Sequence, residues 1–431
     1  MQKNTGPFID ITELRPGHFV HLDLGWMDHP FPLGNFKITS QQQIDTIRAL
    51  GLKQIRWSPE KSELPAPEIT PNEPAPDQAV VAAFAAPLVD PTVLEEQQRR
   101  RALLVAQRQS LVQCERQFTE NARSYQLIMS VVESQPEQAF QEASALIQGM
   151  LQAMNSHEEC AIRLLSENVG DRFALHSVNV TVLSMLLGKA AGLSPHELEA
   201  LGMGALLHDI GKQRLPDRVR FKHENFTLPE TKLYQEHVAH SVTMGKRMGL
   251  VPETLLAISQ HHEMTDGSGF PLACQGEKMS RTAHVLALIN RYDNLCNPPN
   301  PVLALTPHEA LSLIFARMRG RFDKTTLNAF IRMMGIYPPG SLVQLSDQRY
   351  GLVMSVNSAR PLKPRVLIHD DATPLSEAVY LDMEQTPHLN VLRSLKPQQL
   401  PRSALEYLAP RQRVCYYFER ATDAATPGNT Q

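Results

Sequence analysis

The chain has 431 residues, of which 42% are hydrophobic and 20% charged, and its formal net charge at pH 7 is −3. This length predicts two or three domains, and the near-neutral charge excludes a strong general attraction to nucleic acid or to an anionic membrane. No apolar run approaches the ~18 residues of a membrane span, and the N-terminus lacks the apolar core of a signal peptide. The five cysteines are scattered without a Cys-x-x-Cys motif, so we expect a cytoplasmic protein with free thiols.

Residues 1–60 predict a small α/β domain. Residues 18–24 alternate in polarity with the period of a strand, and residues 53–57 are a second candidate strand. Between them, a helical pattern begins after Ser40, and Gly51 is placed to end it in a left-handed conformation.

The middle of the chain changes from a linker to helices. Residues 61–92 are rich in proline and alanine. Such a segment cannot bury enough apolar surface to order itself, so we expect an extended linker. Residues 93–155 contain no proline other than Pro136 and are rich in Glu, Gln, Arg and Ala. This composition predicts a connector of long helices or, more simply, a solvated helical face. Residues 156–335 predict an all-helical domain.

The pattern changes again near the C-terminus. Residues 341–345 and 350–356 alternate like the two strands of a hairpin, and residues 365–368 are another short candidate strand. We therefore expect a small β-rich subdomain over residues 336–420. Residues 421–431 predict a disordered tail.

Several helices of the predicted helical domain each turn a histidine toward the core. His176 lies on an apolar stripe with the period of a helix. A capping box at residues 194–197 begins a second helix, whose inward face carries His208 and which we expect to end at Gly211. Residues 227–230 begin a third helix, which carries His237 on its inward face.

A pair of adjacent histidines, His261 and His262, begins a glycine-rich loop that ends at Pro271.

One buried histidine, such as His176, is most simply interpreted as a core residue with a hydrogen-bond partner. Several of them together with the acidic side chain of Asp209 need a shared explanation. A divalent metal ion provides it, because neutral imidazole and carboxylate are its usual ligands.

Residues 157–335 resemble the HD-GYP family, which are bacterial phosphodiesterases of the wider HD superfamily that hydrolyse cyclic di-GMP. The resemblance rests on His-Asp-x-Gly-Lys at 208–212 and His-His-Glu-x-x-Asp-Gly-x-Gly-[Tyr/Phe]-Pro at 261–271. Residues 9–63 resemble an uncharacterised N-terminal domain that precedes many HD-GYP modules. The resemblance implies a mainly α fold around an all-helical metal-binding domain.

The resemblance also implies two divalent metal ions, iron or manganese, and a role for each motif residue. The first ion would be held by His176, His208, Asp209 and the residue at the family's last ligand position, Asn290. The second would share Asp209 and bind His237, His261 and His262, with His240 as a less favoured substitute. Asp209 and Lys212 would be catalytic, and substrate would contact Lys212, Gly267, Gly269, Phe270 and Pro271. Glu263 and Asp266 would hold the loop by hydrogen bonds, and Asp293 would support the site without binding metal.

The chain departs from the family pattern in three places. Asn290 stands where the family has an aspartate, which removes a charge from the first ion's ligands. Residues 297–302 lack the basic side chains that many members use against the nucleotide phosphates. Arg172 stands where members with three ions carry a glutamate, so we expect two ions.

The predicted function is hydrolysis of cyclic di-GMP to pGpG or GMP in bacterial second-messenger signalling. Two alternatives remain. One is a degenerate module that binds a nucleotide or a protein partner without turnover, and the other is an HD-type hydrolase for a nucleoside polyphosphate or a different cyclic dinucleotide. The N-terminal domain and the connector suggest homodimerisation or regulation by a GGDEF-type or other signalling protein.

Overall fold

The computed structural model describes residues 7–22, 35–50, 52–62, 91–156, 159–166, 172–221 and 225–421. They fall into two units, within residues 1–88 and 89–431. Almost all of the predicted linker at 61–92 and of the predicted tail at 421–431 lies outside the described residues.

The N-terminal unit is a four-stranded antiparallel sheet with one helix, which confirms the predicted small α/β fold. Ser40 caps the helix by accepting a hydrogen bond from the backbone N–H of Gln43, and the core consists mainly of β-branched residues such as Ile44 and Ile47. The strand order is β1-β4-β2-β3. The elements are β1 (Phe8–Asp10), β2 (Phe19–His21), β3 (Asn35–Lys37), α1 (Gln41–Ala49) and β4 (Gln54–Trp57).

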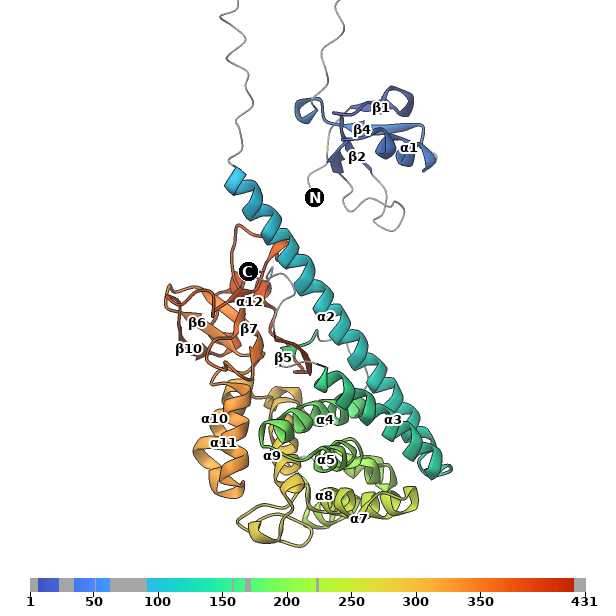
Figure 1. Cartoon of the computed structure of the whole chain (residues 1–431), viewed down its shortest axis with the longest axis vertical. Coiled ribbons are helices and arrows are strands. Elements are labelled where there is room, and N and C mark those ends of the chain that lie inside the picture. Colours follow the sequence, from blue (N-terminus) through green and yellow to red (C-terminus); the bar gives the residue numbers. More distant parts are fainter. Residues whose placement is uncertain are drawn as a thin grey trace, which may run out of the picture. The chain divides into compact units, whose positions relative to one another are not determined.

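The second unit begins with the predicted connector, now seen as α2 (Pro91–Val131) and α3 (Pro136–Asn155). Figure 1 shows α2 running along one side of the unit, and its buried residues belong to the same hydrophobic core as those of the helices that follow. Glu133, between α2 and α3, pairs with Arg214 at 2.6 Å and with Arg247 at 3.1 Å. The domain boundary expected at residue 155 therefore lies within one continuous core.

The helical region follows the predicted start signals. The capping boxes at Ser194 and Thr227 are both formed, and a third, not predicted, begins at Thr306. The helix expected to end at Gly211 ends at Leu207 instead, because the backbone there tightens into a 3₁₀ turn that packs against α7. The elements are α4 (Arg172–Ala190), α5 (Pro195–Leu207), η4 (Ile210–Arg214), α6 (Asp217–Arg220), α7 (Leu228–Met248), α8 (Pro252–Gln260), α9 (Arg281–Cys296), α10 (Pro307–Arg317) and α11 (Lys324–Met334).

A seven-stranded antiparallel sheet closes the second unit, and it includes the predicted hairpin. Its order is β10-β6-β7-β5-β11, with β8 paired to β7 and β9 to β8. One strand, β5, precedes the helical region in the chain, so residues 160–164 are extended within the range predicted to be helical. The elements are β5 (Cys160–Leu164), β6 (Leu342–Leu345), β7 (Tyr350–Asn357), β8 (Arg365–Ile368), β9 (Leu381–Asp382), β10 (Val391–Leu395), α12 (Arg402–Leu408) and β11 (Tyr416–Arg420).

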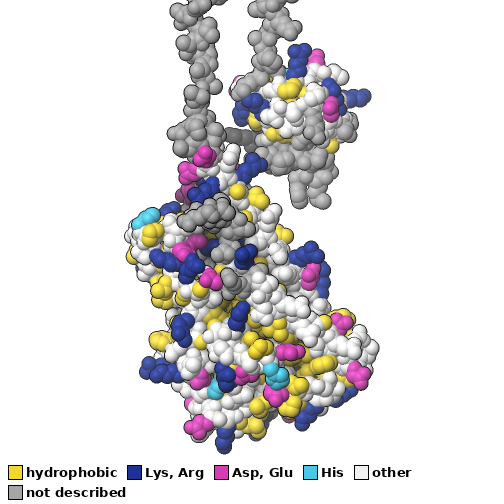
Figure 2. Space-filling model, in the orientation of Figure 1, with side chains coloured by type: hydrophobic (Ala, Val, Ile, Leu, Met, Phe, Trp, Pro, Cys, Tyr) yellow, Lys and Arg dark blue, Asp and Glu magenta, His cyan; other side chains and the backbone are white. Residues whose placement is uncertain are grey.

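Side chains of both charge signs are intermixed on the face of the second unit that Figure 2 shows. This agrees with the near-neutral net charge of the chain. Among the described helices, none has the length and the apolar character that crossing a membrane requires.

Candidate metal centre and active site

Six of the seven predicted metal ligands converge from four parts of the helical region. Two groups share Asp209, and in each group the ligand atoms lie within 4.8 Å of one another. His240, the less favoured substitute, belongs to neither group of described residues. The first group is His176 of α4 with His208 and Asp209, which follow α5; the second is Asp209 with His237 of α7 and with His261 and His262, which follow α8.

The tautomers of the histidines can be deduced from their hydrogen bonds. The Nδ1 atoms of His208, His237 and His261 lie 2.7, 2.5 and 2.6 Å from the carbonyl oxygen three residues earlier. A carbonyl oxygen can only accept, so each Nδ1 carries the proton and each Nε2 presents a lone pair. This second hydrogen bond is the usual way in which a protein orients a metal-binding imidazole.

His176 is oriented in the same way, by a carboxylate. Its Nδ1 donates to Oδ2 of Asp293 over 2.6 Å, and Asp293 also accepts from the amides of Asn179 and Asn297. Asp293 therefore supports the site through His176, as predicted, and leaves Nε2 of His176 facing Asp209 at 3.6 Å.

The spacing of the lone pairs fits metal ions. Nε2 of His176 lies 3.2 Å from Nε2 of His208, and Nε2 of His237 lies 3.3 Å from Nε2 of His261. Neither contact can be a hydrogen bond, since both atoms in each pair are acceptors. Two nitrogens bound to one ion at ~2.1 Å are separated by roughly 3–3.4 Å, which matches.

The carboxylate of Asp209 lies between the two groups. Its Oδ2 is 3.4 Å from Nε2 of His208, and its Oδ1 is 3.4 Å from Nε2 of His237. Oδ1 of Asp209 and Nε2 of His262 are buried and have no hydrogen-bond partner in the described part of the chain. Unpartnered buried polar atoms are costly, and ligation of a cation would remove that cost. The described residues thus fit divalent metal ions.

Burial sets the charges of these groups. It would raise the pKa of Asp209, but Lys212 and His208 outweigh it and hold that pKa well below its usual value. Burial lowers the pKa of His237 to about 4 and holds the pKa values of His261 and His262 well below normal. At neutral pH the second group therefore combines neutral imidazoles with a charged carboxylate, the donor set that divalent metals bind.

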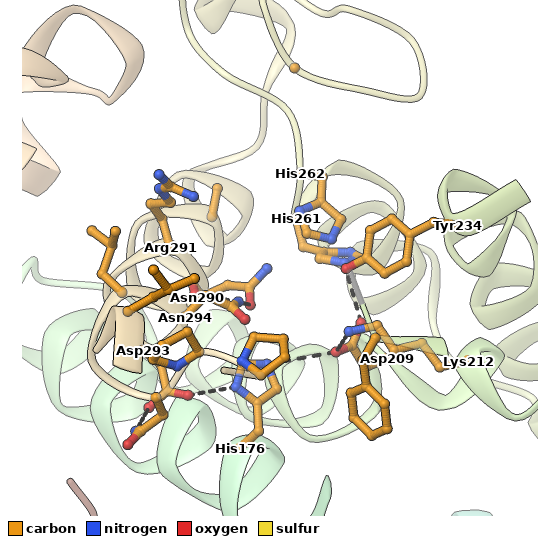
Figure 3. A pocket seen from close by; sticks show the side chains of 18 of the residues that line it. His176, Asp209, Lys212, Tyr234, His261, His262, Asn290, Arg291, Asp293 and Asn294 are labelled. Atoms are coloured by element: carbon orange, nitrogen blue, oxygen red, sulfur yellow. Dashed lines mark hydrogen bonds and ion pairs between the residues drawn. The ribbon is translucent and has the colours of Figure 1, made fainter. Parts of the chain in front are cut away.

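Asn290 lies on α9, is buried and lines the same pocket as His176 and Asp209. Its Oδ1 accepts a hydrogen bond from the amide of Asn294 over 2.7 Å. One lone pair of that oxygen remains, and it could bind an ion without adding charge. In Figure 3, Asn290, Arg291 and Asp293 lie on one side of the pocket, and Asp209, Lys212 and Tyr234 on the other.

Lys212 lines the pocket, but its ammonium group is already paired. Nζ lies 2.5 Å from Oδ2 of Asp209 and 5.4 Å from the centre of the Tyr234 ring. The predicted contact with a substrate phosphate stays a prediction. In the described conformation Lys212 neutralises Asp209.

The glycine-rich loop is held as predicted. The buried carboxylate of Glu263 accepts from the backbone N–H groups of Leu272 and Cys274 at 2.7 and 2.8 Å, and Asp266 accepts from the N–H of Ser268 at 2.9 Å.

The loop is also packed tightly against the histidines. A methyl group on Gly269 would come within 2.5 Å of the backbone around Glu263. The φ of Gly267 is 77°, a left-handed conformation that favours glycine. Phe270 stacks on the ring of His262, with centroids 4.4 Å apart. The expected substrate-contacting residues Gly269 and Phe270 line the pocket, while Gly267 and Pro271 lie in the same loop without being among its lining residues.

The pocket beside the histidines has a volume of about 650 Å³, within the usual range for small-molecule sites. Arg291, Arg321 and Arg413 line it together with the metal-ligand candidates. Sequence reasoning missed all three. The position of Arg291 next to Asn290 on α9 was a usable signal, but nothing in the local pattern around Arg321 or Arg413 pointed to the site.

Three family models match the chain. They are a domain of unknown function (DUF3391) at residues 8–162, an HD domain at residues 126–326, and a KOW domain associated with HD domain at residues 342–403.

Curated relatives match over different lengths. A cyclic di-GMP phosphodiesterase of Pseudomonas aeruginosa is 29% identical over 371 residues, which are 84% of each chain. A cyclic di-GMP phosphodiesterase response regulator of Xanthomonas campestris is 29% identical over 206 residues, 46% of this chain and 54% of that protein. Among solved structures, an HD-G"Y"P protein of Bdellovibrio bacteriovorus covers 75% of this chain and 97% of its own, with 13% identity and a TM-score of 0.39.

Proposed function

Because the chain is an HD-domain protein with a DUF3391 domain on its N-terminal side, we propose that it is a metal-dependent phosphodiesterase that hydrolyses cyclic di-GMP to pGpG or GMP. The observation that carries the proposal is the pair of donor groups that share Asp209. The similarity to a cyclic di-GMP phosphodiesterase over 84% of each chain supports the choice of substrate.

The metal ions, iron or manganese in this proposal, would be held by His176, His208, Asp209 and Asn290 on one side and by Asp209, His237, His261 and His262 on the other. Divalent ions in such a centre supply Lewis acidity that makes water nucleophilic near neutral pH and offsets charge on a phosphoryl group.

Residues around that centre have three further roles. Asp293 keeps the ring of His176 in one tautomer and one orientation. Lys212 offsets the charge of Asp209 and stays within the pocket, where a cation stabilises charge that gathers on a phosphate. Phe270 and Tyr234 form an apolar wall next to His262 and His237, which excludes water and strengthens electrostatic interactions there.

The first experiment measures the metal content of anaerobically purified protein together with cyclic di-GMP hydrolysis, for the wild type and for Asn290→Asp. We expect about two ions per chain and turnover in the wild type. Asn290→Asp adds a charged ligand next to the first ion, so we expect it to raise the metal affinity about tenfold. Asn328→Asp, which adds the same charge at an exposed position on α11, is the matched control and should change neither quantity.

Two other outcomes have clear meanings. One ion or none in the wild type, with turnover only in Asn290→Asp, would identify a binding module that has lost catalysis. Bound metal without cleavage of cyclic di-GMP would remove this substrate. A panel of other cyclic dinucleotides and nucleoside polyphosphates would then identify the reaction.

We also propose that the chain forms a homodimer through α2, and that a GGDEF-type or other signalling protein is a partner. Helix α2 leaves Val105, Val112 and Leu127 exposed by 47, 63 and 42%, and apolar side chains spaced along one long helix suit a helix–helix contact. Light scattering should give the mass of a dimer at micromolar concentration. A monomer there would contradict the dimer and leave the phosphodiesterase proposal untouched.

A further inference from the structure

Three arginines from distant parts of the chain line the pocket that contains the metal-ligand candidates. Arg291 belongs to α9, Arg321 follows α10, and Arg413 lies just before β11. We propose that they form an anion-binding wall. When a cyclic dinucleotide is bound, this wall holds the one of its two phosphodiester groups that is not being cleaved. This inference rests on the proposed function and names the residues that select a ligand with two phosphates.

Arg291 has no counter-ion among the described residues. Its Nε is buried and has no hydrogen-bond partner, and no described carboxylate lies within ion-pair distance of its guanidinium. Arg291 and Arg321 both line the pocket, so an incoming anion would provide the buried Nε of Arg291 with the partner it lacks among the described residues.

Arg321 has only a weak internal partner. Its Nε lies 3.8 Å from Oδ2 of Asp266, and both side chains are substantially exposed, by 50 and 39%. Such a pair contributes little in water. The guanidinium of Arg321 thus stays available to a ligand in the pocket.

Arg413 is held at the pocket by the residue that follows it. The N–H of Val414 donates to Oδ1 of Asn297 over 2.8 Å, and the amide of Asn297 donates back to the carbonyl of Val414 over 2.9 Å. The amide of Asn179 also donates to that carbonyl, and its Oδ1 accepts from the N–H of Tyr416. The start of β11 is therefore fixed to α4 and to the end of α9, the two helices that carry His176 and Asn290.

The charges in the pocket favour a ligand with more than one phosphate. Of the two acidic groups that line it, Asp209 pairs with Lys212, and Asp293 accepts a hydrogen bond from His176. The three arginines outnumber the remaining carboxylate and leave a positive excess. A guanidinium binds a phosphate through two parallel hydrogen bonds, so these residues suit the second phosphodiester of a cyclic dinucleotide while the first lies at the metal centre. They also supply the positive charge that residues 297–302 lack.

The test compares Arg291→Gln, Arg321→Gln and Arg413→Gln in the full-length, metal-loaded protein. The matched controls are Arg319→Gln, two residues from Arg321, and Arg402→Gln in α12, both exposed and both outside the pocket lining. The first readout is equilibrium binding of a slowly hydrolysed phosphorothioate analogue of cyclic di-GMP. The second is KM and kcat for cyclic di-GMP and for bis(p-nitrophenyl) phosphate, which has one phosphate only.

We expect Arg291→Gln and Arg413→Gln each to weaken binding of the analogue and to raise KM roughly 10- to 100-fold, because each loses a charge-assisted hydrogen bond. The exposed Arg321 should show a smaller effect of the same sign. The loss should be much larger for cyclic di-GMP than for bis(p-nitrophenyl) phosphate, and metal content should not change. The two controls should match the wild type.

The outcomes separate this inference from the proposed function. If the wild type cleaves cyclic di-GMP and all three variants bind like the controls, the wall is refuted and the phosphodiesterase stands. If the wild type binds the analogue without cleaving cyclic di-GMP, the phosphodiesterase is refuted, and weaker binding by the variants still supports the wall. A wild type that neither binds nor cleaves overturns both.

Discussion

Hydrolysis of cyclic di-GMP should fall roughly 10³-fold or more when Asp209 is replaced by asparagine. One oxygen of its carboxylate faces the first donor group and the other oxygen faces the second. Among the described residues, Asp209 alone belongs to both groups. Asparagine keeps the shape but removes the charge, and we expect the metal content to fall from about two ions per chain to one or fewer. Metal analysis and turnover, measured on the same preparation, check this result. Asp217→Asn, an exposed carboxylate on α6, is the matched control and should behave like the wild type.

Loss of Asp209 also leaves Lys212 buried without its partner. Breaking a buried ion pair from one side costs about 3–5 kcal/mol, so a folding defect must be separated from a metal defect. The double variant Asp209→Asn/Lys212→Met removes the unpaired charge and should recover stability in denaturant titrations. It should not recover metal binding. Metal binding equal to that of the wild type in either variant would show that Asp209 is not the shared ligand.

Gly211→Ala should both destabilise the protein and weaken the second metal group. A methyl group at this position would overlap the backbone of His237 and Ser241 on α7, and the N–H of Gly211 donates to the hydroxyl of Ser241 over 2.9 Å. The 3₁₀ turn that follows Asp209 would have to move away from the helix that carries His237. Overpacking of this kind costs about 1–3 kcal/mol, occasionally more.

Chemical denaturation and metal analysis measure the two effects of Gly211→Ala. Gly149→Ala on α3 is the control, since nothing lies within 4 Å of the added methyl group. It should stabilise the protein by up to about 1 kcal/mol, the helix preference of alanine over glycine. If both variants behave alike, close packing at Gly211 does not hold the two ligand-bearing segments together.

The parts of the site that sequence reasoning anticipated are those with local signals. Capping boxes locate the starts of α5 and α7, and helical spacing then turns His176 and His237 inward. The adjacent histidines and the loop after them form one continuous motif. Each of these signals depends on residues close together in the sequence, so the pattern is visible without the fold.

What was missed depends on distant contacts. The hydrogen bonds between Asn297 and Val414 join residues 117 positions apart, and no local pattern predicts that Arg413 reaches the pocket. The predicted helix end at Gly211 is wrong for the same reason, a contact with a distant segment. Close packing of Gly211 against α7 explains the glycine there, and the helix ends earlier. The salt link between Lys212 and Asp209 was also not foreseen, since the motif alone does not show which anion the lysine would bind.

The place of β5 in the C-terminal sheet has a consequence for protein synthesis. Arg163 on β5 pairs with Glu419 on β11, and the two residues are 256 positions apart. A nascent chain that has emerged only as far as α11 already holds every histidine of the site, but β5 still has neither of its neighbouring strands. Since such long-range pairing forms late, the ribosome must translate through β11 before the pocket wall that contains Arg413 can close. A truncated product that ends earlier would carry the metal-ligand candidates without Arg413 in the pocket lining.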